Sequence, residues 1–286
     1  MRLVALLTCH NRRDLTLRCL ASYFSQAFPE EAPELEAVVV DDGSADGTAE
    51  AVRARFDAVR IIEGDGSLFW ARGMQRAETK AVETRPDFLL WLNDDVVLDD
   101  TAVATLLRAA ASCPDAVVVG ALVDPVTKAV TYSGVSLSRW HPLRARLVEP
   151  VGGPLEADTF NGNVVLVPRA VYERVGPIDG HFSHAQADFD YGLRARMAGF
   201  RTVVAPAPIG ACSRVGQRAR FDDMSLPLRE RWRLVQGPTG LPMRSHARYL
   251  RRHGGLLWPI FWAAPYVKLI VSALSTAPRR WLARRR

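Results

Sequence analysis

Short apolar runs alternate with amphipathic stretches through the first 123 residues of the chain. An apolar run bounded by polar residues is typical of a strand that is buried on both faces of a sheet. Predicted strands lie at residues 3–7, 37–40, 59–62, 88–92 and 116–123. Apolar residues at helical spacing predict helices between them, at residues 15–24, 46–56, 71–82 and 101–111, with Asp14 placed to cap the first. This alternation predicts an α/β fold with a mostly parallel central sheet and flanking helices.

The regular alternation ends at Asp124. Beyond this point the pattern predicts short antiparallel strands at residues 130–133 and 137–148, and further strands at residues 160–167 and 201–205. An amphipathic helix is predicted at residues 191–198, where Gly199 provides the C-cap. Asp190 and Arg194 have the i, i+4 spacing of a helical ion pair.

Polar segments follow four of the predicted strands, at residues 8–12, 41–44, 64–70 and 93–95. The carboxyl ends of parallel strands share one edge of a sheet, and ligands of open α/β sheets bind at that edge. We therefore expect these four segments to lie close together in space.

Asp94 and Asp95 are adjacent carboxylates at the end of the strand FLLWL. Two like charges repel each other, and a hard divalent cation such as Mg2+ or Mn2+ would relieve the repulsion through oxygen ligands. The pair therefore indicates a metal–diphosphate site. The alternative is a solvated acidic turn that caps the next helix.

Several common site motifs are absent from the sequence. No GxGxxG dinucleotide motif, GxxxxGK[ST] phosphate loop or GxSxG nucleophile motif is present. The segment SADGT is similar to an aspartyl-phosphatase motif, but Ser44 stands where the nucleophilic aspartate would be. These observations argue against the corresponding enzyme classes.

Six segments, taken in order, resemble a family 2 inverting glycosyltransferase of the GT-A fold: VALLTCHNRRDLTLRCLAS, VVVDDGSADGT, GDGSLFWARGM, FLLWLNDDVVL, FNGNVVLVPRAVYERVGPID and ADFDYGLRARMAGF. The resemblance covers roughly residues 3–215. The segments GDGSLFW and RRHGGLLWP are most similar to bacterial members that add sugars to surface polysaccharides, including rhamnosyltransferases.

The resemblance implies a donor site at the predicted sheet edge. Residues that would hold the nucleotide base, ribose, phosphates or donor sugar are Thr8, His10, Asn11, Arg12, Asp41, Asp42, Asp65, Gly66, Trp70, Asn93 and Asp94. Asp95 would be the direct ligand of Mg2+ or Mn2+. Two alternatives remain open, because residues 41–44 could form only a tight turn with a helix cap and Trp70 could be a core aromatic residue.

The resemblance also implies a catalytic base, which must take the proton of the attacking acceptor hydroxyl. We assign Asp188 as this base and Asp190 as the second candidate, while Asp188 could instead cap the following helix. Many relatives carry a downstream histidine that completes the metal site, but residues 205–217 contain none. Metal binding would then depend on Asp95 with the diphosphate, or on His184 as a substitute.

The composition is that of a globular protein, with 48% apolar and 24% charged residues among 286. The four cysteines are scattered and show no metal-binding spacing, as expected for free thiols in a reducing compartment. The N-terminal run LVALL is too short for a signal-peptide core, which favours a cytoplasmic protein.

The net charge of +6 is concentrated near the C-terminus, because no acidic residue follows Glu230. Residues 255–274 are apolar but interrupted by Pro259, Pro265 and Lys268. This pattern predicts two short helices at a membrane interface, and hence peripheral attachment to the inner face of the plasma membrane. The alternative is a helical hairpin that packs on the catalytic domain or in a dimer interface.

Three regions are therefore expected. Residues 1–123 would form a Rossmann-like half that binds the nucleotide sugar, residues 124–220 the acceptor-binding and catalytic half, and residues 221–286 a basic, amphipathic helical extension. The predicted activity is inverting, metal-assisted transfer from a UDP- or dTDP-linked sugar to a glycan or lipid-linked acceptor, without a nucleic-acid partner. The alternatives are a catalytically weak or inactive binding protein of the same fold, and a nucleotidyltransferase, for which the segment CHNRRD lacks glycines.

Overall fold

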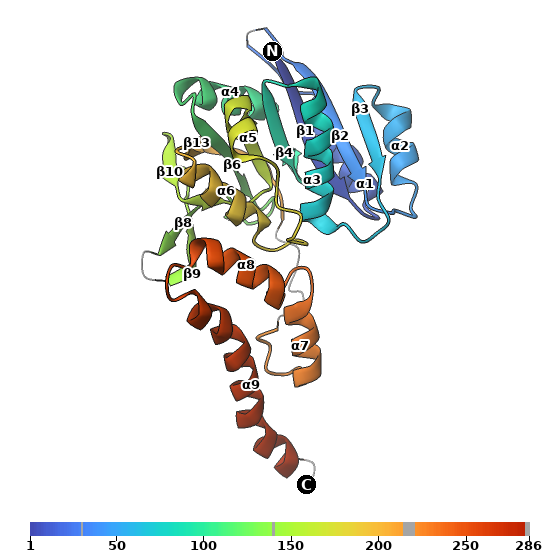
Figure 1. Cartoon of the computed structure of the whole chain (residues 1–286). Coiled ribbons are helices and arrows are strands. Elements are labelled where there is room, and N and C mark those ends of the chain that lie inside the picture. The colour runs from blue at the N-terminus through green and yellow to red at the C-terminus, as the bar shows by residue number, and fades with distance from the viewer. Residues whose placement is uncertain (30, 139–140, 214–220, 284–286) are drawn as a thin grey trace.

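The structure is a computed structural model that describes residues 1–29, 31–138, 141–213 and 221–283. Its central sheet has the strand order β10-β13-β6-β12-β4-β1-β2-β3. Helices cover both faces of the sheet, and a helical extension leaves the body on one side (Figure 1). The fold is of the GT-A type, as the sequence predicts.

The N-terminal part of the sheet is parallel and follows the predicted pattern closely. Its strands pair in register from β4 to β3, with Cys9 opposite Asp41, so that the polar segments end at one edge. The strands are β1 (Arg2–Cys9), β2 (Glu34–Asp41), β3 (Val59–Glu63) and β4 (Phe88–Leu92). The connecting elements are α1 (Arg13–Phe24), α2 (Thr48–Arg55), α3 (Phe69–Ala81) and the short 3-10 helix η1 (Val82–Thr84).

The prediction that Asp14 caps the first helix is wrong. Helix α1 begins at Arg13 and its N-cap is Arg12, whose side chain makes no capping hydrogen bond, while Asp46 Oδ2 accepts from Arg13 N at 3.0 Å. Asp14 lies inside the first turn, where its charge still interacts favourably with the positive end of the helix dipole.

The second half of the sheet is mixed. β12 (Val164–Pro168) runs antiparallel to both β4 and β6 (Ala116–Val123), while β13 (Arg201–Ala211) is parallel to β6. β13 is longer than predicted, because it continues through Pro206 and Pro208 with shifts in register. The remaining elements at this sheet are β5 (Val97–Leu98), β7 (Val130–Tyr132), β10 (Leu155–Ala157), α4 (Ala102–Ser112), α5 (Arg169–Val175) and α6 (Ala187–Met197).

A second sheet has the order β11-β8-β9 and is antiparallel. Its strands are β8 (Gly134–Ser138), β9 (His141–Leu147) and β11 (Thr159–Phe160). The predicted antiparallel strands after Asp124 are thus confirmed.

Two apolar clusters lie on opposite faces of the central sheet. In the second cluster the fully buried Trp91 packs edge-on against Phe160 and Tyr191, with ring centroids 5.7 and 4.8 Å away. Aromatic pairs of this geometry add stability beyond their buried area. Tyr191 belongs to α6, so this cluster fixes the position of the helix that carries Asp188.

The C-terminal extension consists of α7 (Leu228–Gln236), α8 (Met243–His253) and α9 (Trp258–Ala283). Tyr249 and Leu250 of α8 are buried in the second apolar cluster, and Figure 1 shows α9 running away from the body to the C-terminus. In the part of the chain that the structure describes, no helix has both the length and the apolar character needed to cross a membrane.

The prediction of two short helices between residues 255 and 274 is wrong, since α9 passes through both prolines. Pro259 lies in the first turn, where a backbone N–H would have no intrahelical acceptor. Pro265 lacks the N–H that would donate to the carbonyl of Phe261 in a regular helix, yet α9 continues through it.

Candidate active site

The predicted polar segments meet around a cavity of about 670 Å³ at the carboxyl edge of the sheet. The predicted residues that line it are Thr8, His10, Arg12, Asp42, Gly66, Trp70, Asn93, Asp94, Asp95 and His184. The fold therefore brings together side chains from β1, β2, β4 and the start of α3, as a ligand site at this edge of the sheet requires.

Asp42 determines the shape of one wall of this cavity. Its Oδ1 accepts a hydrogen bond from the backbone N–H of Gly66 at 2.9 Å. Its Oδ2 accepts from the N–H groups of Leu68 and Phe69 at 3.0 and 2.9 Å. Since Asp42 is 4% exposed and its carboxylate is occupied by the backbone, it positions the loop before α3.

Three predicted donor residues do not line this cavity. Asp41 is buried and accepts a hydrogen bond from Ser44 N at 2.9 Å. This bond belongs to the tight turn at residues 41–44 that the sequence allowed as an alternative to a donor site. Asn11 has a φ of +51° and accepts from Ala45 N at 2.8 Å. Asp65 accepts hydrogen bonds from the N–H and hydroxyl of Ser67 at 3.0 and 2.7 Å. All three stabilise the turns behind the cavity wall.

Arg12 bridges the two adjacent carboxylates after β4. Its Nη1 lies 2.6 Å from Asp94 Oδ1 and 3.2 Å from Asp95 Oδ2. The guanidinium of Arg12 thus reduces the repulsion between the Asp94 and Asp95 carboxylates. The sequence predicts a metal ion in this role. Among the described residues, no group of three or more His, Cys, Asp or Glu side chains could hold a metal ion by itself.

Asp94 and Asp95 differ in their access to the cavity. Burial raises the pKa of Asp94 to about 6 although Arg12 acts in the opposite direction, and its Oδ2 is buried without a hydrogen-bond partner. The Asp95 side chain is 17% exposed. Mg2+ usually binds through one or two carboxylates together with substrate phosphates and waters. The donor set therefore fits a cation shared with a diphosphate, with Asp95 as the more accessible ligand.

Asn93 is engaged by Trp70 and not by a charged group. The indole Nε1 of Trp70 donates to Asn93 Oδ1 at 2.8 Å, so the amide oxygen already has a donor. The ring of Trp70 packs edge-on against Trp91 and His184, with centroids 5.8 and 6.3 Å away. Trp70 is half-buried and lines the cavity. It therefore packs as a core aromatic residue and also forms part of the candidate site, the two alternatives that the sequence left open.

Asp188 lines an adjoining cavity of about 300 Å³, which shares Trp70, Asn93 and His184 with the first. Its Oδ1 accepts from Phe189 N at 2.9 Å and its Oδ2 from Gly162 N at 3.2 Å. Asp188 comes from α6 and Asp94 from the end of β4, yet both border the same hollow region. The Asp94–Asp95 pair and Asp188 thus border adjoining cavities, whereas Asp41, the third acid expected to face the cleft, lines neither of them.

Burial raises the pKa of Asp188 to about 6, and the two backbone hydrogen bonds only partly oppose this shift. No ion pair involves Asp188 in the described ranges of the chain. A half-buried carboxylate without a cationic partner and with a pKa near neutrality has the properties of a general base.

Asp190 has the opposite environment, because several cationic side chains surround it. It is fully buried, accepts from Arg194 Nε at 2.9 Å and from Arg252 Nη1 at 2.9 and 3.0 Å, and lies 3.0 Å from Nε2 of His253. Burial would raise its pKa, but the hydrogen bonds from His253 and Arg252 and the nearby arginine charges lower it below the ordinary value. The predicted Asp190–Arg194 pair is confirmed, and Asp190 lines neither cavity that borders Trp70.

Sequence reasoning missed some residues that line the two cavities, namely Phe69, Tyr132, Asn161, Gly162 and Asn163. Gly162 lies between Trp70 and Asp188, because a Cβ there would come within 2.7 Å of the indole and 3.2 Å of Asp188 Cβ. The Asn-Gly pair at the head of β12 was the available signal. A polar residue and a glycine directly before a buried strand indicate close approach of a neighbour.

Comparison with known proteins decides the family. A sequence profile of glycosyl transferase family 2 matches residues 5–172, and a profile of glycosyl transferase family group 2 matches residues 89–283. The chain belongs to glycosyl transferase family 2. Relatives of the chain include N-acetylglucosaminyl-diphospho-decaprenol L-rhamnosyltransferase of Mycobacterium tuberculosis, 25% identical over 197 residues. The match covers 59% of this chain and 64% of that enzyme, less than two thirds of its length.

The chain is also similar to solved structures. The Staphylococcus aureus TarS 1–349 complex with UDP-GlcNAc has a TM-score of 0.57 at 15% identity, covering 90% of this chain and 73% of TarS. The mannosyltransferase PcManGT of Pyrobaculum calidifontis, in complex with GDP-Man and Mn2+, has a TM-score of 0.55 at 19% identity. That match covers 99% of this chain and 80% of PcManGT. At these identities the similarity establishes the shared fold.

Proposed function

We propose that the transferase moves a sugar from a nucleotide diphosphate donor, UDP- or dTDP-linked, to a glycan or lipid-linked acceptor with inversion at the anomeric carbon. The observation that carries this proposal is the position of Asp188, which forms no ion pair with any described residue, in the cavity next to the one that Asp94 and Asp95 border. Residues 1–123 would bind the donor, residues 124–220 would supply the acceptor side and the base, and residues 221–286 would form an extension.

Asp188 would take the proton of the acceptor hydroxyl as its oxygen forms a bond to the anomeric carbon. The bond between that carbon and the phosphate oxygen breaks in the same displacement, and the nucleoside diphosphate leaves with the electron pair. A single displacement inverts the configuration. Arg12 is placed to bind the charge that develops on the leaving diphosphate.

A bound Mg2+ or Mn2+ would neutralise part of the diphosphate charge, and Asp95 with Asp94 would hold it. Arg12 would then have to leave at least one of the two carboxylates. The relative that binds Mn2+ supports this role, as does the match of an exposed carboxylate to a hard cation.

A donor-hydrolysis assay tests the proposal. The transferase should release nucleoside diphosphate slowly from its own nucleotide sugar, and Mn2+ should accelerate the release. The donor can be found first by thermal shift, because a ligand that binds the folded state raises its apparent stability. A protein that binds a nucleotide sugar but never releases product would instead be an inactive binding protein of this fold. The Trp70 contact to Asn93 and the small set of metal ligands favour that alternative.

We also propose that the extension attaches the transferase to the inner face of a bacterial plasma membrane, where a lipid-linked precursor of a surface polysaccharide would be the acceptor. Exposed apolar side chains along α9 support this, with Val267, Ile270 and Val271 being 54%, 45% and 58% exposed. Replacing Ile270 and Val271 by Glu should abolish sedimentation with anionic vesicles. The matched control replaces Val126 and Val151, which are 85% and 75% exposed elsewhere. Equal loss in both variants would contradict the attachment.

A further inference from the structure

A larger cavity of about 1400 Å³ lies beside the candidate active site, between the loop before α6, the start of α3 and helix α8. Five arginines line it: Arg72, Arg244, Arg248, Arg251 and Arg252. Within the described ranges of the chain, no Asp or Glu side chain contributes to its lining. An arginine-rich hollow without acids is suited to an anion, because guanidinium groups bind phosphate oxygens in pairs.

The arginines face the cavity because of their spacing on α8. Arg244, Arg248 and Arg251 recur at intervals of four and three residues, which places them on one side of the helix. The other side is buried through Tyr249 and Leu250, and His246 lies against Gln186 with 3.2 Å between Nδ1 and Oε1. Because Tyr249 and Leu250 are packed against the body, the arginines on the opposite side of α8 face the cavity.

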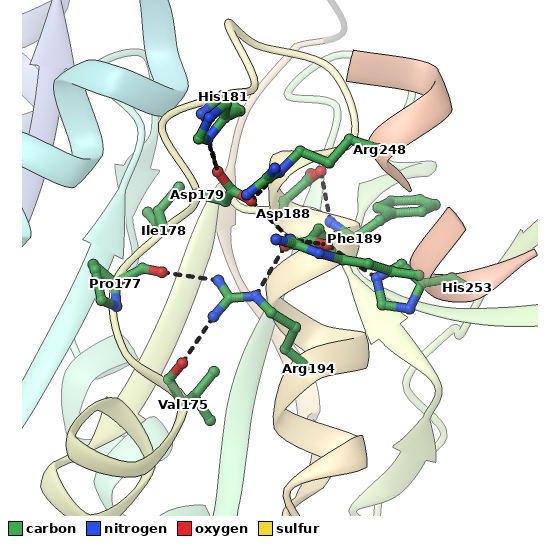
Figure 2. A network of polar contacts seen from close by, with 12 residues as sticks. Val175, Pro177, Ile178, Asp179, His181, Asp188, Phe189, Arg194, Arg248 and His253 are labelled. Carbon is green, nitrogen blue, oxygen red and sulfur yellow. Dashed lines mark hydrogen bonds and ion pairs between the residues drawn. The ribbon is translucent and has the colours of Figure 1, made fainter. Parts of the chain in front are cut away.

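Only part of this positive charge is neutralised by the protein. Arg248 and Arg252 pair with Asp179 at 2.6 and 2.8 Å, as the network in Figure 2 illustrates for Arg248. Among the described residues no ion pair is formed by Arg72, Arg244 or Arg251, and the guanidinium of Arg251 lies over the Trp258 ring at 4.9 Å. At least three positive charges thus remain for a ligand.

Apolar surface adjoins the arginines. Met243 and Trp262 line the same cavity. Leu256 and Leu257, directly before α9, are 98% and 57% exposed, and Ile260 in its first turn is 63% exposed. A ligand with a charged group and an apolar chain would match both surfaces. Phe69, which has a φ of +55°, lines this cavity and also the cleft with Asp94 and Asp95. A molecule held by the arginines could therefore reach the donor side.

We propose that the arginine-lined cavity binds the diphosphate of a lipid-linked acceptor, with its lipid chain along the start of α9 and its sugar directed past Phe69 toward Asp188. This inference rests on the proposed transfer reaction, since it names the chemical class of the acceptor. In this arrangement the donor diphosphate and the acceptor diphosphate bind at different places. That of the donor lies at the sheet edge near Arg12, and that of the acceptor lies between α3 and α8.

Binding of farnesyl diphosphate, a short lipid diphosphate, tests the inference in calorimetry with the full chain. Replacing Arg244 and Arg251 by Gln should weaken its binding about tenfold or more, because charge-assisted contacts are lost. Arg72→Gln, on a different element, should also weaken it. The control replaces Arg229 and Arg233 of α7, which removes the same charge from exposed positions outside the cavity and should leave affinity within about twofold. Thermal unfolding verifies that each variant is folded.

The ligand series identifies which part of the acceptor is recognised. Farnesol should not bind measurably, and inorganic pyrophosphate should bind more weakly than farnesyl diphosphate. Equal affinity for pyrophosphate and farnesyl diphosphate would contradict the lipid assignment. Equal weakening by the α7 control would indicate general charge attraction and would overturn the site.

Nucleotide binding separates this inference from the proposed reaction. UDP affinity should be unchanged in the Arg244/Arg251 variant, and UDP should not displace farnesyl diphosphate. Displacement by UDP would place the lipid diphosphate in the donor cleft and refute the separate site. Binding of farnesyl diphosphate through these arginines, without binding of any nucleotide sugar, would contradict the proposed reaction and leave the anion site intact.

Discussion

Asp188 and Asp190 lie in the first turn of the same helix, and their surroundings are opposite. Asp188 borders a cavity and receives two backbone N–H groups, and burial raises its pKa to about 6. Asp190 is fully buried among Arg194, Arg252 and His253, which lower its pKa. Identical side chains in neighbouring positions thus have different chemistry, because one lacks a cation and the other is surrounded by cations.

This difference assigns separate roles to the two carboxylates. A base must accept a proton, which an aspartate surrounded by arginines does poorly because its charged form is stabilised. A structural anion must keep its charge, and Asp190 does so while connecting α6 to α8 through Arg252. The helix therefore carries a proposed reactive group on the cavity side and an anchor for the C-terminal extension on the other side.

The largest expected effect is that of Asp188→Asn. Loss of the proposed base should reduce transfer about 10²–10⁴-fold, while nucleotide binding and stability change little. Product formation and nucleotide affinity should be measured on the same preparation. Transfer within a few-fold of the unsubstituted protein would exclude Asp188 as the base.

The sequence predicts the sheet edge and its polar segments well, for a local reason. Strands such as β1 and β4 are buried on both faces, so their apolar runs and the polar residues that follow are contiguous in sequence. The environment of Asp190 is not local, because Arg252 lies 62 residues further along the chain. No spacing rule predicts that contact.

Two other features of the structure differ from the sequence prediction, also because of contacts between residues that are distant in the chain. The sequence did not indicate that the Asp42 carboxylate is taken up by backbone groups 24 to 27 residues away. The prolines of residues 255–274 predicted a break, but α9 is continuous, and its Trp262 and Tyr266 donate hydrogen bonds to the carbonyls of Met243 and Leu241. Local propensity identifies the elements, and packing between distant elements decides what their polar groups do.

Asp190→Asn should have the second largest effect, and it should be on stability. Removing one member of a buried charge cluster leaves Arg194 and Arg252 without their counter-charge, which costs about 3 kcal/mol of unfolding free energy. Urea unfolding measures this change. The control is Glu63→Gln, which breaks the exposed pair with Arg53 and should cost less than about 1 kcal/mol. Similar losses in both variants would contradict the anchoring role.

Arg12→Met extends the comparison to carboxylates that share one cation. Asp94 and Asp95 would lose their bridging guanidinium, and stability without divalent ions should fall by about 1–3 kcal/mol. Added Mn2+ should then raise the unfolding temperature more than it does with Arg12 present, because no guanidinium competes for the carboxylates. Arg13→Met, at the next and exposed position, is the control. Equal Mn2+ shifts in all three proteins would show that Arg12 does not compete with the metal.

The pH dependence of transfer should reflect the raised pKa of Asp188. The base works only when deprotonated, so kcat should be constant above a pH of about 7 and fall about tenfold per unit well below about 6. Asp94 has a pKa of about 6 as well, but its protonation should change nucleotide affinity and so appear in KM. A kcat that follows an ordinary aspartate, falling only near pH 4, would contradict the environment described for Asp188.

Glu78→Gln should have the smallest effect on transfer, and it tests whether burial alone makes a carboxylate a base. Glu78 of α3 is more deeply buried than Asp188, and burial raises its pKa to about 7, but it borders none of the cavities near Trp70. Its Oε2 accepts from Ile178 N at 3.0 Å, a hydrogen bond that the Gln carbonyl can also accept. Transfer should therefore be unchanged, and unfolding free energy at pH 5 should change by less than about 1 kcal/mol.

The sign of the pH effect at Glu78 follows from its raised pKa. Between the ordinary value of 4.5 and about 7 the folded protein keeps a proton that the unfolded chain has lost. Stability therefore decreases as pH rises through this range, and Gln removes that decrease. Urea unfolding at pH 5 and pH 8 should show the variant gaining stability over the unsubstituted protein at the higher pH. If Glu78→Gln reduced transfer as strongly as Asp188→Asn, access to the cavity would not be what distinguishes the base from other buried carboxylates.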